Sequence, residues 1–67
     1  MKLYSKLTVY DDDGYPFVIK VFCRGNNAPY DIRTDGNFWS TCENLNEVDD
    51  EIKDIINLYH LRFVPSI

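Results

Sequence analysis

Residue types that build reactive sites are scarce in this sequence. Its 67 residues include one histidine, two cysteines and three glycines. A zinc site needs four Cys or His ligands in close pairs, and Cys23, Cys42 and His60 do not provide them. The glycines are dispersed, so there is no glycine-rich phosphate loop. We therefore expect neither a metal nor another cofactor, and the two cysteines remain either packed thiols or a disulfide.

Long apolar runs and an excess of basic residues are also lacking. No run approaches the roughly 18 residues that a membrane span requires, and the N-terminal residues alternate like a strand rather than a secretion signal. We expect a protein of the cytoplasm, which would be the host's cytoplasm if a virus encodes it. Seven Lys and Arg against eleven Asp and Glu leave a net charge of -4. Because binding to phosphates needs clustered basic residues, the net charge argues against direct nucleic-acid binding.

The composition is that of a small globular domain. Hydrophobic residues make up 45% of the chain and aromatic residues 15%. A chain of this length buries only about 60% of the surface that its unfolded form exposes, so aromatic rings are an efficient way to build a core. We expect one domain over residues 1–67.

The first half of the chain predicts a β-hairpin. Residues 3–10 and 15–24 alternate with the period of half-buried strands, and Asp13-Gly14 between them is a strong turn signal. The predicted core positions are Leu3, Leu7, Val9, Phe17, Ile19, Val21 and Cys23.

A second hairpin is predicted after a loop at residues 25–29. Its strands are residues 30–34 and 38–42, joined by a turn at Asp35-Gly36. In the latter strand, alternation places Phe38, Ser40 and Cys42 on one face and Trp39 and Thr41 on the other.

A helix over about residues 45–59 is the clearest element. Asn44 is a favourable N-cap, Glu47 follows at the capping-box spacing, and apolar residues recur with helical period. Residues 61–64 resemble a closing strand. The predicted fold is a small two-layer α+β domain of order β-β-(β-β)-α-β, in which one helix packs on a mostly antiparallel sheet of three to five strands.

No catalytic or calcium motif is complete. The calcium-loop pattern fails around Gly14, because Val9 stands at a ligand position and Lys20 replaces the terminal Glu. His60 falls at the predicted helix end, where it would complement the helix dipole rather than serve as a base. We expect no enzyme activity and no catalytic residues.

The negative charge is concentrated on the predicted helix. Residues 43–54 hold six acidic residues and one lysine, a local charge of -5, while the rest of the chain carries +1. We interpret these acidic residues as a docking face for a basic protein, with a solvated helix face as the competing interpretation. They are Glu43, Glu47, Asp49, Asp50, Glu51 and Asp54.

Aromatic residues form a second candidate surface. One helix covers one face of a sheet, so rings assigned to the opposite face or to loops are available to a partner, to a small second core or to a homodimer contact. The candidates are Tyr4, Tyr10, Phe22, Tyr30 and Trp39.

The sequence thus favours a small acidic protein-binding module, with inhibition of a basic or nucleic-acid-binding host protein by phosphate mimicry as a special case. Phage inhibitors of host enzymes are similar in size and charge, which is an analogy and not a motif. The alternative is a weak binder of single-stranded nucleic acid through an aromatic and basic sheet face. Its predicted residues are Tyr10, Lys20, Phe22, Arg24 and Trp39.

Overall fold

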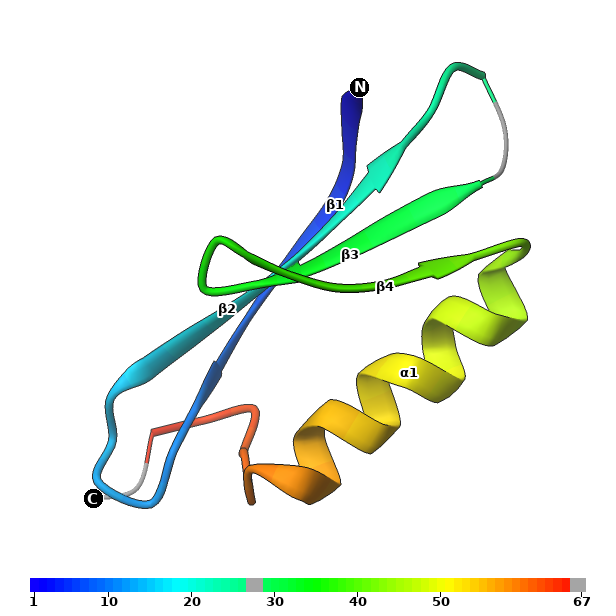
Figure 1. The fold of residues 1–67 in the computed structure, drawn as a ribbon. Coiled ribbons are helices and arrows are strands. Elements are labelled where there is room, and N and C mark those ends of the chain that lie inside the picture. The colour runs from blue at the N-terminus through cyan, green and yellow to red at the C-terminus, as the bar shows by residue number, and fades with distance from the viewer. Residues whose placement is uncertain (27–28, 66–67) are drawn as a thin grey trace.

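The structure is a computed structural model that describes residues 1–26 and 29–65 (Figure 1). The loop predicted at residues 25–29 lies partly outside the described residues, as does the end of the chain after residue 65.

The protein is a two-layer α+β domain, as the sequence predicts. Four strands, β1 (Lys2–Tyr10), β2 (Pro16–Cys23), β3 (Tyr30–Thr34) and β4 (Asn37–Cys42), form an antiparallel sheet in the order β1-β2-β3-β4. The helix α1 (Leu45–Leu58) packs on one face of this sheet and leaves the other face uncovered (Figure 1).

The predicted closing strand at residues 61–64 is wrong. This segment makes only an isolated antiparallel bridge, in which Tyr10 and Arg62 exchange two backbone hydrogen bonds of 2.8 Å. Leu61 is buried in the core, while Phe63 and Val64 are exposed. The apolar composition of the segment therefore does not lead to a fifth strand.

Both predicted Asp-Gly turns are present. Asp35 and Gly36 have φ angles of 48° and 87°, and the flanking residues Thr34 and Asn37 pair with each other. Positive φ at both central residues is typical of the type I′ turn. Asp35 also bonds β2, because its Oδ1 accepts from Val18 N–H at 2.9 Å and its N–H donates to Val18 O at 2.8 Å.

The core lies between α1 and the covered sheet face. The largest fully buried side chains are Val9, Ile19, Val21, Ile32 and Ile55, of which only Ile55 belongs to the helix. The predicted core face of β2 is confirmed. Burial of apolar area at about 25 cal/mol per Å² makes this interface the main stabilising contribution.

Two β-bulges correct the predicted faces of the outer strands. In β1 the register shifts between Leu3 and Ser5, so Leu3 is on the uncovered face and 48% exposed instead of in the core. In β4 the shift at Trp39 turns its indole toward α1, where it packs against the core. A bulge adds one residue to a strand and so reverses the alternation beyond it.

Helix α1 ends one residue earlier than predicted. Tyr59 is the C-cap, His60 adopts a left-handed φ of 54°, and Leu61 N–H bonds Ile56 O at 2.9 Å. This hydrogen-bond pattern is a Schellman motif, in which glycine is the usual residue at the His60 position. The backbone at His60 thus closes the helix, while its side chain is exposed.

Candidate functional site

Four of the predicted acidic residues share one side of α1. Successive helix residues are about 100° apart, so Glu47, Asp50, Glu51 and Asp54 project from one stripe, while Asp49 lies on another side. The stripe borders β4, the last strand of the sheet. We call these four residues the acidic stripe.

Glu51 links the acidic stripe to the sheet. Its Oε1 accepts hydrogen bonds from Trp39 Nε1 at 3.2 Å and from Ser40 Oγ at 3.1 Å. The β4 bulge brings both donors to the helix side. Glu51 is therefore partly buried and holds the helix against β4, a structural role that the sequence did not reveal.

Glu47 contributes to the start of the helix. Asn44 Oδ1 accepts from Glu47 N–H at 2.9 Å, which confirms the predicted N-cap. In return, the Glu47 carboxylate accepts from the backbone N–H of Glu43 at 2.6 Å, one residue before the usual capping-box partner. Its negative charge also lies at the positive end of the helix dipole.

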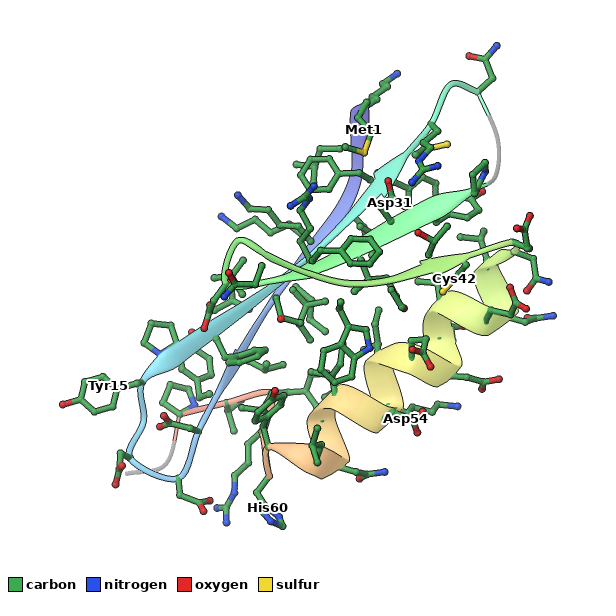
Figure 2. The ribbon with its side chains drawn as sticks, in the orientation of Figure 1. Met1, Tyr15, Asp31, Cys42, Asp54 and His60 are labelled. Carbon is green, nitrogen blue, oxygen red and sulfur yellow. The ribbon has the colours of Figure 1, made fainter. Side chains whose placement is uncertain are left out.

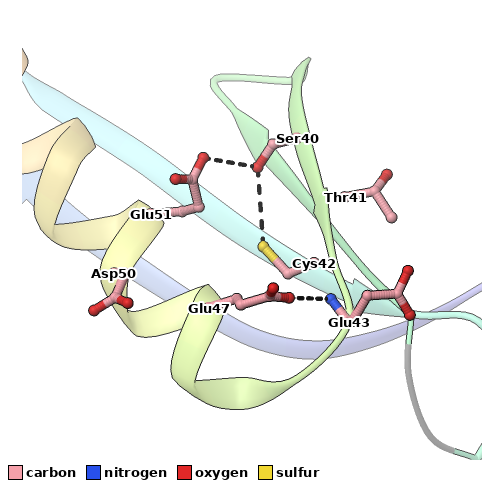
Figure 3. Close-up of a pocket in the computed structure, with 7 residues that line it drawn as sticks. All are labelled: Ser40, Thr41, Cys42, Glu43, Glu47, Asp50 and Glu51. Atoms are coloured by element: carbon pink, nitrogen blue, oxygen red, sulfur yellow. Dashed lines mark hydrogen bonds between the residues drawn. The ribbon is translucent and has the colours of Figure 1, made fainter.

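The acidic residues surround a hollow of about 340 Å³ between α1 and β4 (Figure 3). The carboxylates on its rim belong to Glu43, Glu47, Asp50 and Glu51, and β4 supplies Ser40, Thr41 and Cys42. Among the described residues, no ion pair involves these carboxylates. The hollow is consequently an open site of concentrated negative charge, which we call the acidic hollow.

The predicted aromatic surface is divided between the two sides of the sheet. Tyr30 is buried in the core, and Tyr4 packs edge-on against it with ring centroids 5.3 Å apart. Trp39 is on the helix side, 6.2 Å from the Tyr59 ring. Of the five predicted residues, Tyr10 and Phe22 remain on the uncovered face. The bulges at Tyr4 in β1 and at Trp39 in β4 explain why simple alternation misplaced these two rings, whereas Tyr30 belongs to a regularly paired part of β3.

The uncovered face contains a buried carboxylate. Asp31 is 3% exposed and accepts from Arg24 Nε at 2.9 Å, Arg24 Nη2 at 3.0 Å and Thr41 Oγ1 at 2.8 Å. The guanidinium holds the pKa of Asp31 below its ordinary value, against the raising effect of burial. Figure 2 labels Asp31 on β3 and Cys42 on the neighbouring strand β4.

The two cysteines are thiols in the covered layer. Cys23 and Cys42 lie on either side of Tyr30 in the strand register, so about 10 Å separates their Cα atoms. A disulfide needs a Cα distance below about 7 Å. Burial raises the pKa of the Cys42 thiol, and the nearby carboxylates of Glu51 and Glu47 raise it further against the effect of Ser40. A protonated, buried thiol is a poor nucleophile.

The described part of the chain holds neither a metal-ligand cluster nor a membrane-spanning helix. Residues 1–26 and 29–65 contain no group of three or more His, Cys, Asp or Glu side chains that could hold a metal ion. The helix found there has 14 residues and is neither long nor apolar enough to cross a membrane.

Comparisons with known proteins add no further assignment. No family model, no curated protein and no solved structure matches this chain. The geometry of the acidic hollow and of the uncovered sheet face is therefore the basis for a functional hypothesis.

Proposed function

We propose that the protein is a non-enzymatic binding module that presents its acidic stripe and hollow to a basic partner protein. The observation that carries this proposal is the convergence of four carboxylates on one open hollow, with no ion pair to a basic side chain among the described residues. A cluster of like charges opposes folding, and a cationic partner would relieve that repulsion.

Phosphate mimicry is the form of this activity that we favour. Carboxylates spaced along one helix side would occupy a nucleic-acid-binding surface of the partner, and the protein would then act as an inhibitor. The acidic hollow is lined by residues of both α1 and β4. Because β4 is an edge strand of the sheet, a partner bound at the hollow could contact the helix and the open edge of β4 together. Long-range attraction would mainly increase the association rate.

Charge reversal tests the proposal. Asp50 and Asp54 are exposed, and no hydrogen bond to either side chain is found among the described residues, so Asp50→Lys with Asp54→Lys should preserve the fold. Glu47 and Glu51 are unsuitable because both have structural hydrogen bonds. The matched control reverses Asp13 and Asp49, which produces the same change in net charge away from the acidic hollow.

The readout is capture of basic proteins from a lysate of the source cells by the immobilised protein. We expect the Asp50/Asp54 variant to lose proteins that the wild type and the control both retain, and added DNA to compete for those proteins. Retention of the same proteins by all three forms would refute docking at the acidic stripe. Capture that persists at about 0.5 M salt, where the Debye length is only a few Å, would refute phosphate mimicry.

A further inference from the structure

The sheet register aligns three cationic side chains on the uncovered face. Lys6 pairs with Lys20 across β1 and β2, and Lys20 pairs with Arg33 across β2 and β3. The next residue in this line is Phe38 of β4, which pairs with Arg33. We call Lys6, Lys20 and Arg33 the cationic row.

The cationic row faces away from the helix. Lys20 lies between Ile19 and Val21, which are 0% and 1% exposed on the covered side. Successive strand residues point to opposite faces, so Lys20 and its register partners project from the uncovered side. Lys6, Val18 and Lys20 border a shallow hollow there, together with Asp35 and Gly36.

This arrangement is unfavourable for the isolated protein. Like charges directly opposite each other in an antiparallel sheet are destabilising. The two nearby carboxylates form no ion pair with the row in the described structure. Asp31 is hydrogen-bonded by Arg24 and Thr41 and attracts Arg33 only at longer range, while Asp35 Oδ1 accepts from Val18 N–H. The row therefore presents positive charge that an anionic ligand would complement.

The aromatic neighbours identify the class of anion. Phe38 extends the row and is 56% exposed, while Phe22 and Tyr10 are half-buried on the same face. Cations beside available rings are the elements with which proteins bind unpaired bases and their phosphates. From this juxtaposition we propose that the uncovered face binds single-stranded nucleic acid, with phosphates on the cationic row and a base stacked on Phe38.

A second copy of the chain fits this face less well. Two uncovered faces in contact would place two cationic rows against each other. Docking of the acidic helix of another copy would match the charges, but α1 and the uncovered face are on opposite sides of the molecule (Figure 1). Such a head-to-tail contact does not form a two-fold dimer and would build a ring or a filament instead.

The overall negative charge does not prevent this activity. The acidic stripe belongs to the other layer of the fold, and packed layers are about 10 Å apart. The Debye length at physiological ionic strength is about 8 Å, so solvent ions screen much of the repulsion from the helix. The net charge of the chain thus understates the positive potential at the cationic row.

The test is fluorescence anisotropy of a labelled oligothymidylate of about 12 nucleotides, titrated with the full chain. Neutralisation of three phosphates predicts that log K falls with log salt with a slope of about -2. We expect Lys20→Glu to weaken binding at least tenfold and Phe38→Ala to weaken it about tenfold. The matched control Lys53→Glu makes the same charge change on the exposed side of α1 and should remain within about twofold of the wild type.

Thermal unfolding separates lost binding from lost folding. Lys20→Glu places an acid between Lys6 and Arg33, so its Tm should rise by about 2–8 °C while binding falls. Equal weakening by Lys53→Glu would overturn the proposal, as would unchanged binding in Lys20→Glu or Phe38→Ala. Equal displacement of the probe by polyglutamate of matched charge would assign the face to acidic proteins instead. The result of this binding experiment does not depend on whether the acidic hollow binds a basic protein, because the Asp50 and Asp54 variants test that hollow separately.

Discussion

Trp39 and Glu51 connect the sheet to the helix by a 3.2 Å hydrogen bond from the indole Nε1 to the carboxylate Oε1. The donor is the bulge residue of β4, and the acceptor belongs to the acidic stripe of α1. One of the carboxylates predicted to bind a partner is therefore also a structural acceptor, which separates it from its exposed neighbour Asp54.

Replacement of Glu51 should destabilise the domain. Glu51→Ala leaves Trp39 Nε1 and Ser40 Oγ without their acceptor, at a cost of about 1–3 kcal/mol. Urea unfolding followed by tryptophan fluorescence measures the loss. Asp54→Ala, on the same side of the helix but exposed, should change the free energy of unfolding by less than about 0.5 kcal/mol. Equal effects of the two substitutions would contradict a structural role for Glu51.

The Asp31 carboxylate should make stability depend on acid pH. Its folded-state pKa is lowered, mainly by the hydrogen bonds from Arg24, relative to an ordinary value of 3.8. The group thus stabilises the fold above about pH 3.8, and this contribution declines as the pH falls toward the folded-state pKa. Asp31→Asn should cost about 1–3 kcal/mol near neutral pH. The free-energy difference between wild type and variant, measured by urea unfolding, should narrow below pH 3.8; a difference that stays constant would refute the linkage.

The helix end offers a stabilising substitution. His60 has a φ of 54°, a conformation that costs a non-glycine residue about 1 kcal/mol. His60→Gly should therefore raise the free energy of unfolding by up to that amount and the Tm by about 4–8 °C per kcal/mol, read by circular dichroism. His60→Ala retains a Cβ and is the control, for which no gain is expected. A lower Tm for His60→Gly would show that the side chain contributes more than the backbone conformation costs.

The thiol of Cys42 should react slowly in the native protein. It is buried, and burial together with the charges of Glu51 and Glu47 raises its pKa, so little thiolate forms near neutral pH. Titration with a chromogenic disulfide reagent should give slow native labelling and rapid reaction of two thiols after denaturation. Cys42→Ser identifies which signal belongs to this residue. Rapid labelling of native Cys42 would contradict its protected position.

Local chemistry explains what could be predicted from the sequence. The Asp-Gly turns, the Asn44 cap and the alternation of β2 depend on residues close together in the chain, and the structure confirms them. Leu3 and Trp39 were assigned to the wrong faces because a bulge depends on the partner strand, which the local pattern does not contain. Residues 61–64 have a strand-like composition but form only one bridge, for the same reason.

The candidate sites show the same division. The sequence alone determined that the acidic residues concentrate on one helix, because helical periodicity is a local property. The structural role of Glu51 and the packing of Trp39 against the core arise from contacts between the helix and the sheet. The cationic row also depends on tertiary structure, since its members come from three strands and meet through backbone pairing. Strand register is set by contacts between distant residues, and it converts a chain of net charge -4 into a domain with one acidic layer and one basic face.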